Sequence, residues 1–550
     1  MVFPNAFLRL FYWIVVLCST VTFAQQNQAL PTSNATAPTS VFFSRPELTP
    51  PILNVTISDS NSSGHAPGYV FIAPYQALQS GPYIYDKQGN LIWDGWGASG
   101  PSNAHNFHVC NWQGQPHLCF SSENQLLGYG RGQAVILDSN YKTIQSVQIG
   151  AGQTQADMHE FQLTDNGTAL MTAYDLLPWD LSAQGITSGI GYITSGVFQE
   201  INVTSGEVLF SWSSIDHVPI SSSYVKPNST DTSGNGLSVA TPYDYFHINA
   251  IDKSTTTGNY LVSSRHTSTL YYISSSDGSI IWRLTSSSLS NFTLTNFNFS
   301  FQHDGRLISE NSTHITLSIF DNASDGYNQT SSYSSGKFIA IDLLAGTATL
   351  TSSVSFPDSI VEGGLLVGSQ GNTQLLSNSN IFNGWGPYAW ATEHDSSGTH
   401  VVWAANFAQG VTMNYRAFSF DGWNSTPADS PAMWAYAKTA DGSYPLYVYV
   451  SWNGATEVAS WSFYGSMVAP NKAGYPNTVG DTAQVVLLGS VDKTGFETMF
   501  ESPEMYPYVL AQAVDGKGTA LRNSTWIQAF VPSEALTGAC GNTSCNAAMQ

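Results

Sequence analysis

The segment YDKQGNLIW, residues 85–93, joins a turn of polar residues and Gly to an apolar strand that ends in Trp. Related turn-and-strand segments recur along the chain, as LDSNYKTIQSV (137–147), INVTSGEVLFSW (201–212), SSSDGSIIW (274–282), IDLLAGTATL (341–350) and HDSSGTHVVW (394–403). Intervals of roughly 50 to 75 residues indicate a repeat architecture, and four strands per repeat are typical of a propeller blade. Helical periodicity is nearly absent. The sequence therefore predicts an all-β protein with a six-bladed β-propeller.

The chain divides into four predicted segments. Residues 1–24 are a signal peptide, residues 25–65 an irregular arm rich in Ser, Thr and Pro, and residues 66–440 the propeller. After about residue 440 the pattern of strands changes. Residues 441–550 are therefore predicted to form a separate β region. A small β-sandwich is the preferred interpretation, and an insertion packed on the side of the propeller is the alternative.

The N-terminal segment has the features of a secretory signal. Arg9 precedes a short apolar core at residues 10–17, and Thr22-Phe23-Ala24 is a small-residue cleavage site before Gln25. The apolar core is too short to span a membrane, and no second candidate span follows. We therefore expect a secreted, extracellular protein with no membrane span in the mature chain.

Glycosylation sequons and cysteines agree with secretion. The predicted glycosylated residues are Asn34, Asn54, Asn61, Asn166, Asn202, Asn228, Asn291, Asn298, Asn311, Asn322, Asn328, Asn424, Asn523 and Asn542. Cys18 leaves with the signal peptide, so an even number of cysteines remains. Their spacing suggests the bridges Cys110–Cys119 and Cys540–Cys545. A zinc site is the alternative, which secretion and the wide separation of the two pairs disfavour.

The net charge excludes one class of partner. The chain carries a formal charge of -21 and only 17 Lys and Arg residues. A nucleic acid needs a basic surface, so we expect no nucleic-acid partner. The oligomeric state cannot be inferred from the sequence.

Three histidines occupy matching places in successive repeats. His159 lies in ADMHEFQLTDNGTAL, His247 in YDYFHINAIDKSTTTGNYLV and His303 in FSFQHDGRLIS. The first strand of each propeller blade lines the central channel, so the three imidazoles are predicted to meet although about 55 to 90 residues separate them. A single histidine in a strand is more often an ordinary core or surface residue. Three at one offset favour a site.

Other polar residues accompany these histidines. Asn249 follows His247 by two positions, which places both on one face of a regular strand. The next strand carries Ser264-Arg265-His266. An Arg among several imidazoles predicts a site for sulfate, phosphate or carboxylate, and His266 and Glu393 are predicted substrate-binding residues.

Several candidates have simpler interpretations. Asp157, Asp244 and Glu393 could orient the imidazoles, or they could cap turns. His105 and His108 could form a metal pair, although a position in a loop beside the Cys110–Cys119 bridge is the preferred interpretation. The sequence contains no P-loop, no G-x-S-x-G elbow and no H-E-x-x-H motif. We expect no metal site and no cofactor.

At these residues the chain resembles the arylsulfotransferase family, in its fungal secreted branch. The matching segments are DMHEFQLTDNGTALMTAYD (157–175), DYFHINAIDKSTTTGNYLVSSRH (244–266), FSFQHDGRLISENSTH (299–314) and DGWN (421–424), and the likeness covers about residues 65 to 425. Bacterial members of the family are six-bladed propellers that move a sulfuryl group from an aryl sulfate to a phenol.

The resemblance implies a role for each matching residue. His303 would be the nucleophile, and His159, His247, Asn249 and Arg265 would contact the sulfuryl oxygens. A neutral imidazole is a competent nucleophile, and the transfer would pass through a sulfohistidine with ping-pong kinetics. The remaining contact residues of the bacterial enzymes have no match in the downstream sequence. The expected substrate is a small aromatic or phenolic compound.

Two alternatives stay open from the sequence. The pocket could perform general acid–base chemistry on an aromatic secondary metabolite, in which case activity would survive the loss of His303. It could also be a non-catalytic propeller that binds a glycan, a metabolite or a protein.

Overall fold

The structure is a computed structural model that describes residues 36–59, 64–126, 128–153, 155–229, 233–407, 411–469 and 485–533. The predicted signal peptide, the sequons at Asn34, Asn61 and Asn542, and the predicted Cys540–Cys545 bridge lie outside these residues. The described chain is nearly all β, as the sequence predicted. Its helical structure consists of the short 3-10 segments η1 (Trp96–Ala98), η2 (Ser182–Gln184), η3 (Ser214–Asp216), η4 (Ile220–Ser222) and η5 (Gly386–Tyr388). None of the described helices has the length and apolar character needed to cross a membrane.

The hairpin predicted at residues 85–93 forms at that place. Asp86 Oδ1 accepts the N–H groups of Gln88 and Asn90 at 2.9 and 2.8 Å, which closes the turn. Gly89 has a φ of 89°, and a Cβ there would lie 2.6 Å from the Leu53 carbonyl oxygen, so the turn requires glycine. Trp93 on the returning strand is buried.

The strands up to Phe420 form six sheets in the described part of the chain, and each sheet has four or five strands. Neighbouring strands are antiparallel except for the pairs β11–β13 and β18–β22. The first three sheets contain β2 (Tyr69–Tyr75), β3 (Tyr83–Asp86), β4 (Leu91–Asp94) and β27 (Met413–Phe420); β5 (Asn103–Trp112), β6 (Gln115–Gln125), β7 (Gly130–Leu137) and β8 (Thr143–Val147); and β9 (Asp157–Leu163), β10 (Thr168–Trp179), β11 (Gly191–Asn202), β12 (Val208–Ser213) and β13 (Tyr243–Asp244). The other three contain β14 (Ile248–Lys253), β15 (Tyr260–Ser264), β16 (Thr269–Ile273) and β17 (Ile280–Thr285); β18 (Thr293–Thr295), β19 (His303–Glu310), β20 (His314–Asp321), β21 (Ser335–Asp342) and β22 (Thr347–Ser355); and β1 (Asn54–Ser58), β23 (Asn372–Leu375), β24 (Ile381–Gly384), β25 (Trp390–His394) and β26 (Val401–Asn406).

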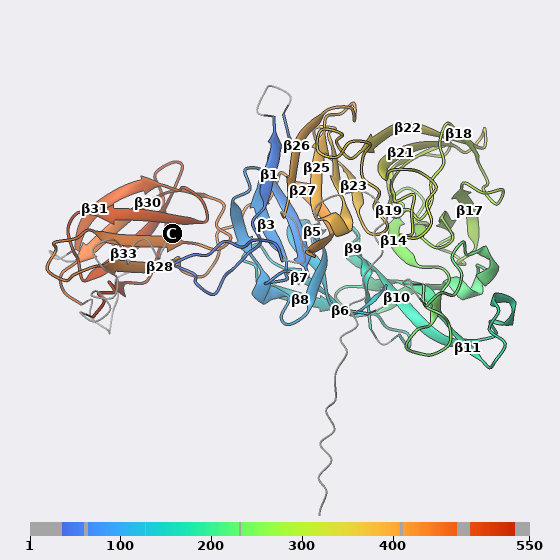
Figure 1. Cartoon of the computed structure of the whole chain (residues 1–550), viewed down its shortest axis with the longest axis horizontal. Coiled ribbons are helices and arrows are strands. Elements are labelled where there is room, and N and C mark those ends of the chain that lie inside the picture. The colour runs from blue at the N-terminus through green and yellow to red at the C-terminus, as the bar shows by residue number, and fades with distance from the viewer. Residues whose placement is uncertain are drawn as a thin grey trace, which may run out of the picture.

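One strand from each of these sheets takes part in a closed ring of contacts. Going round the ring, β5 contacts β9, and the sequence of neighbours continues through β14, β19, β23 and β27 back to β5. Segments far apart in the chain therefore lie side by side at the centre, as the labels β5, β9, β14 and β23 in Figure 1 show. The ring is the place where the predicted site residues can meet.

Two strand pairs connect the beginning of the described chain to its later part. β27 pairs with β2, so that Phe420 lies opposite Tyr69. β1 pairs with β26 at the edge of its sheet, which gives part of the predicted irregular arm an edge strand.

The C-terminal part forms two further sheets at one end of the molecule (Figure 1). The first contains β28 (Ala432–Ala437), β29 (Leu446–Ser451) and β32 (Glu497–Ser502), and the second β30 (Val458–Ser466), β31 (Val485–Asp492), β33 (Tyr508–Asp515), β34 (Ala520–Asn523) and β35 (Ile527–Gln528). Both sheets contribute to one hydrophobic cluster, with Val448 from the first and Trp461 and Phe463 from the second. β28 begins before residue 440, so the C-terminal sheets start earlier than the sequence predicted.

The predicted glycosylation sites differ in exposure. Those that are exposed are Asn54, Asn166, Asn291, Asn298, Asn311, Asn328 and Asn424, and those that are half-buried are Asn202, Asn228 and Asn523. Asn322 is fully buried, and its Nδ2 donates to the carbonyl oxygens of Val367 and Gln370 at 2.9 and 3.0 Å. A glycan cannot be attached to that nitrogen in this fold, so the prediction for Asn322 is wrong.

Candidate active site

The three predicted histidines meet at the ring of inner strands. His159 lies on β9, His247 directly precedes β14 and His303 begins β19. The ring centroids of His159 and His247 are 4.8 Å apart, and those of His159 and His303 are 6.4 Å apart. All three side chains are buried, with at most 5% of any residue exposed. The repeat spacing thus brought the three imidazoles together as predicted.

Two of the histidines each bind a carboxylate through Nδ1. Asp157 Oδ2 lies 2.6 Å from His159 Nδ1, and Asp244 Oδ2 lies 2.6 Å from His247 Nδ1. Both carboxylates also accept the backbone N–H of their histidine. The orienting role considered for Asp157 and Asp244 therefore fits the geometry, and each Nε2 is left to face another partner.

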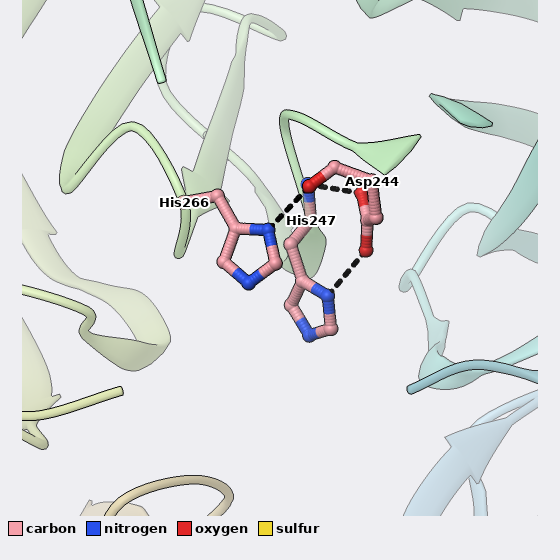
Figure 2. A group of neighbouring side chains, drawn as sticks. All are labelled: Asp244, His247 and His266. Atoms are coloured by element: carbon pink, nitrogen blue, oxygen red, sulfur yellow. Dashed lines mark hydrogen bonds and ion pairs between the residues drawn. The ribbon is translucent and has the colours of Figure 1, made fainter. Parts of the chain in front are cut away.

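The other two imidazoles have Nδ1 at a backbone carbonyl. His303 Nδ1 lies 2.7 Å from the Gly371 oxygen, and His266 Nδ1 lies 2.5 Å from the Asp244 oxygen (Figure 2). A carbonyl oxygen only accepts, so Nδ1 carries the proton in both rings. Nε2 of a neutral ring then holds the lone pair.

The environment keeps these imidazoles neutral. Burial lowers the pKa of His303 well below its usual 6.5, and the positive charge of Arg416 lowers it further. Burial also lowers the pKa of His247 and of His266 well below that value. At neutral pH, His303 therefore presents a lone pair on Nε2.

The partner of that lone pair is Tyr415 on β27, a residue that sequence reasoning missed. The Tyr415 hydroxyl lies 2.9 Å from His303 Nε2, and its ring is perpendicular to the imidazole with a centroid distance of 5.0 Å. Burial raises the pKa of Tyr415 well above 10, so the phenol stays protonated and donates to Nε2. The segment MNYRAFSF lies outside the matching repeat positions, and only pairing of β27 with β2 brings it to the centre.

Arg265 and Asn249 are both buried beside the cluster. Arg265 Nη1 lies 2.8 Å from His266 Nε2, and Arg265 Nη2 donates to the Gly368 oxygen at 2.7 Å. Asn249 Nδ2 donates to the Gln302 oxygen at 2.7 Å, next to His303. Strict alternation does not explain this position: the register of β14 against β15 shifts between Ile248 and Ala250, and His247 has a φ of 53°.

Arg416, also missed from the sequence, belongs to an ionic network with Glu160 and Asp304, the residues that follow His159 and His303. Its NH2 donates to the Asn249 oxygen at 2.7 Å, and its guanidinium lies within 3.4 Å of both Glu160 and Asp304. Arg306 pairs with the same two carboxylates at 2.7 Å. This network fixes β9, β14, β19 and β27 relative to one another.

Three other candidates lie differently from the predictions. Glu393 does not join the histidines: it pairs with Lys87 at 2.8 Å and accepts from Asn380 and the Ala66 N–H. His105 and His108 lie on β5 and not in a loop, and the adjacent Cys110–Cys119 bridge forms as predicted. His105 is fully buried 3.2 Å from Glu123, with a pKa lowered to about 3 by burial and by His159.

One group among the described residues could hold a metal ion. Asp244, His247 and His266 each offer a ligand atom within 4.8 Å of the others. Figure 2 shows that both Nδ1 atoms are already engaged by Asp244. The guanidinium of Arg265 donates to Nε2 of His266, and its positive charge favours an anion over a cation at this position.

A separate cleft of about 540 Å³ contains none of the cluster histidines. It lies where the β3–β4 hairpin meets the C-terminal sheets, with Asp86, Asp421, Trp423 and Lys493 among its lining residues. The buried histidines are a better candidate for chemistry because their protonation and orientation are fixed.

The chain resembles a known protein family and several solved structures. A family model described as "Arylsulfotransferase (ASST)" matches residues 108–408, which is more than half of the chain. No curated protein matches. Solved structures that resemble the chain include a Bacteroides caccae protein of unknown function (14% identity, 64% of this chain and 98% of that chain, TM-score 0.36) and the Myceliophteria thermophila Cps50 (Swd1) β-propeller domain (9% identity, 68% and 89%, TM-score 0.31). At these TM-scores and sequence identities, we draw no functional conclusion from the solved structures.

Proposed function

Since the chain belongs to the arylsulfotransferase family, we propose that it transfers a sulfuryl group between phenolic compounds through a sulfohistidine on His303. The observation that carries the proposal is the state of His303. Its Nδ1–H is held by the Gly371 oxygen, so the lone pair of the neutral ring lies on the proposed nucleophile Nε2, where it accepts the Tyr415 hydrogen bond.

The proposed reaction has two balanced steps. His303 Nε2 attacks sulfur, the aryl S–O bond breaks, and the phenolate leaves. The oxygen of a second phenol then attacks the sulfur of the sulfohistidine and the N–S bond breaks. The proton of the acceptor phenol ends on the first phenolate, so the overall reaction needs no cofactor.

Four residues are proposed to bind the sulfuryl oxygens: His159, His247, Asn249 and Arg265. Arg265 supplies positive charge, and the Asp157 and Asp244 carboxylates fix the orientation of the His159 and His247 rings. Removing one such donor typically costs about 10²–10³ in rate. These residues are closed off from solvent, so substrate entry requires a rearrangement of the surrounding chain.

The proposal extends to the arrangement of the sheets and to the cellular compartment. We infer that the six sheets around the ring of inner strands are six propeller blades, and that the two C-terminal sheets form a β-sandwich. We also propose secretion, glycosylation at the exposed sequons and membership of the fungal branch. Culture-medium localisation and glycosidase-induced mobility shifts test the first two.

The test of function is incubation with 4-nitrophenyl sulfate and a series of phenols. We expect release of nitrophenol, sulfation of the acceptor and an adduct on His303. The His303→Ala variant should lose all three. His314→Ala, whose side chain is 61% exposed, is the matched control and should retain them. If wild type forms no adduct and no sulfated acceptor with any donor, the proposal fails.

A second candidate function rests on the two Asp–His pairs. Asp157–His159 and Asp244–His247 each have the geometry of an oriented general base. The site could then act on an aromatic metabolite by proton transfer alone. Activity that survives His303→Ala and is lost in His159→Ala or His247→Ala would favour this function over sulfuryl transfer.

A further inference from the structure

Tyr415 places a phenol of the protein itself at the proposed nucleophile. Its hydroxyl lies 2.9 Å from His303 Nε2, and 99% of the residue is buried. The hydroxyl has a second neighbour, the His159 carbonyl oxygen, at 3.3 Å. Because the hydroxyl has one proton and Nε2 has the lone pair, the shorter contact is a hydrogen bond from Tyr415 to His303.

The direction of this hydrogen bond matters for group transfer. The lone pair of Nε2 accepts the hydrogen bond from Tyr415, and the same lone pair forms the N–S bond of a sulfohistidine. In related phosphoryl transfers, the entering and leaving atoms lie roughly in line. The Tyr415 oxygen therefore lies on the side of His303 from which a phenolic oxygen must leave or approach the sulfur. In the described structure this side chain lies where the proposed reaction requires a substrate phenol.

Tyrosine also has the chemistry of the proposed acceptors, because its side chain is a phenol. We propose that Tyr415 is an internal sulfuryl acceptor, which becomes a tyrosine O-sulfate when donor is present and no free phenol competes. This inference rests on the proposed sulfuryl transfer through His303. Admitting sulfur requires the Tyr415 oxygen to withdraw from its present distance to a near-attack separation of about 3–3.5 Å from the sulfur atom.

The step is balanced. The Tyr415 oxygen forms a bond to sulfur, and the Nε2–S bond of sulfohistidine 303 breaks with its electron pair returning to Nε2. The phenolic proton of Tyr415 ends on the phenolate that the donor released. The net change is donor aryl sulfate plus tyrosine giving free phenol plus tyrosine sulfate.

Other buried tyrosines near the cluster lack this geometry. The Tyr174 ring lies 5.9 Å from the His159 ring, but its hydroxyl donates to the Ile248 carbonyl oxygen at 3.0 Å. The Tyr75 hydroxyl contacts the Gln370 side chain at 2.7 Å. Selective modification of Tyr415 is therefore expected from the contacts alone.

The experiment uses the full chain incubated with 4-nitrophenyl sulfate in the absence of any phenol acceptor, followed by peptide mapping at neutral pH. We expect the mass of one sulfuryl group on the peptide that contains Tyr415, close to one group per chain. Tyr174→Phe should keep this modification, whereas His303→Ala and Tyr415→Phe should lose it.

The outcomes separate the two proposals. If wild type sulfates an added phenol and forms the His303 adduct while Tyr415 stays unmodified, the internal-acceptor inference is overturned and the proposed function stands. Equal modification of Tyr415 in wild type and His303→Ala also overturns it, because the group would then not pass through His303. If neither an adduct nor a sulfated phenol forms, both proposals fail. The wild-type measurement decides the question even if a variant does not fold.

Discussion

Asp157 accepts several hydrogen bonds, two of them from His159. We expect Asp157→Asn to lower both the free energy of unfolding and the catalytic rate. Oδ2 accepts from His159 Nδ1 at 2.6 Å, from the His159 N–H at 3.0 Å and from Thr172 Oγ1 at 3.0 Å. Oδ1 accepts the Gly130 N–H at 2.8 Å. Burial acts to raise the pKa of Asp157, but His159 and the hydrogen-bond donors hold it below its usual value, so the carboxylate is charged.

The expected loss of stability follows from these four bonds. In the variant, the amide oxygen takes the position with three donors, and the NH2 group then faces the Gly130 N–H. A buried donor without a partner costs about 1–3 kcal/mol, and bonds to a neutral oxygen are weaker than bonds to a carboxylate by about 1 kcal/mol each. Loss of the buried charge offsets part of this cost. We expect the free energy of unfolding to fall by about 2–4 kcal/mol.

Urea denaturation of wild type and variant measures this difference, with an unchanged m-value as the sign that both unfold alike. Asp138→Asn is the matched control. Asp138 Oδ1 accepts the Asn140 and Lys142 N–H groups in a partly exposed turn, where Asn is equally suitable, so a change within about 0.5 kcal/mol is expected. Under the proposed mechanism, kcat/KM of Asp157→Asn falls about 10²-fold. A stability loss no larger than that of the control would refute the reasoning.

Three further predictions concern other parts of the molecule. Replacing Cys110 and Cys119 by Ser opens a loop with a sequence separation of 9 and should lower the free energy of unfolding by about 2–3 kcal/mol, measured by urea denaturation against oxidised wild type; equal midpoints would contradict this. Glu393→Gln leaves Lys87 buried without its charged partner and should lower the free energy of unfolding by about 3–5 kcal/mol, with the Michaelis constant for an aryl sulfate unchanged. A raised Michaelis constant would support the original prediction that Glu393 binds substrate. Since the pKa of His303 is lower in the folded chain than its usual 6.5, the unfolded chain binds the proton first, and the free energy of unfolding falls as the pH drops below 6.5. The His303→Asn variant lacks this group, so its free energy of unfolding should fall by about 1.4 kcal/mol less per pH unit. Parallel plots of unfolding free energy against pH for the two proteins between about pH 6.5 and 5 would argue against a neutral His303.

The sequence predicted those features that repeat. Matching offsets placed His159, His247 and His303 in one cluster, and the turn at Gly89 formed because only glycine fits its backbone. These results depend on local geometry and on the periodic strand pattern. The Cys110–Cys119 bridge likewise joins the two strands of one hairpin, in which Cys110 lies opposite His117 and Cys119 lies opposite His108.

Features that depend on long-range pairing could not be predicted. Tyr415 and Arg416 reach the site only because β27 pairs with β2, and no local pattern in the sequence encodes that register. Glu393 was predicted to bind substrate, but its partner Lys87 lies 306 positions away in the chain. Asn249 was placed correctly beside the site by an argument from regular alternation that a β-bulge invalidates.

The pairing of β27 with β2 also determines when a protein molecule can first acquire its chemistry. During synthesis the ribosome releases His159, His247 and His303 well before Tyr415 and Arg416, and domains generally fold as they emerge. β27, the inner neighbour of β2, is synthesised about 340 residues after β2. A nascent chain stalled before residue 413 would therefore hold the three imidazoles without the phenol and guanidinium that complete their surroundings, and the emergence of residues 413–420 is the event that allows the centre to assemble.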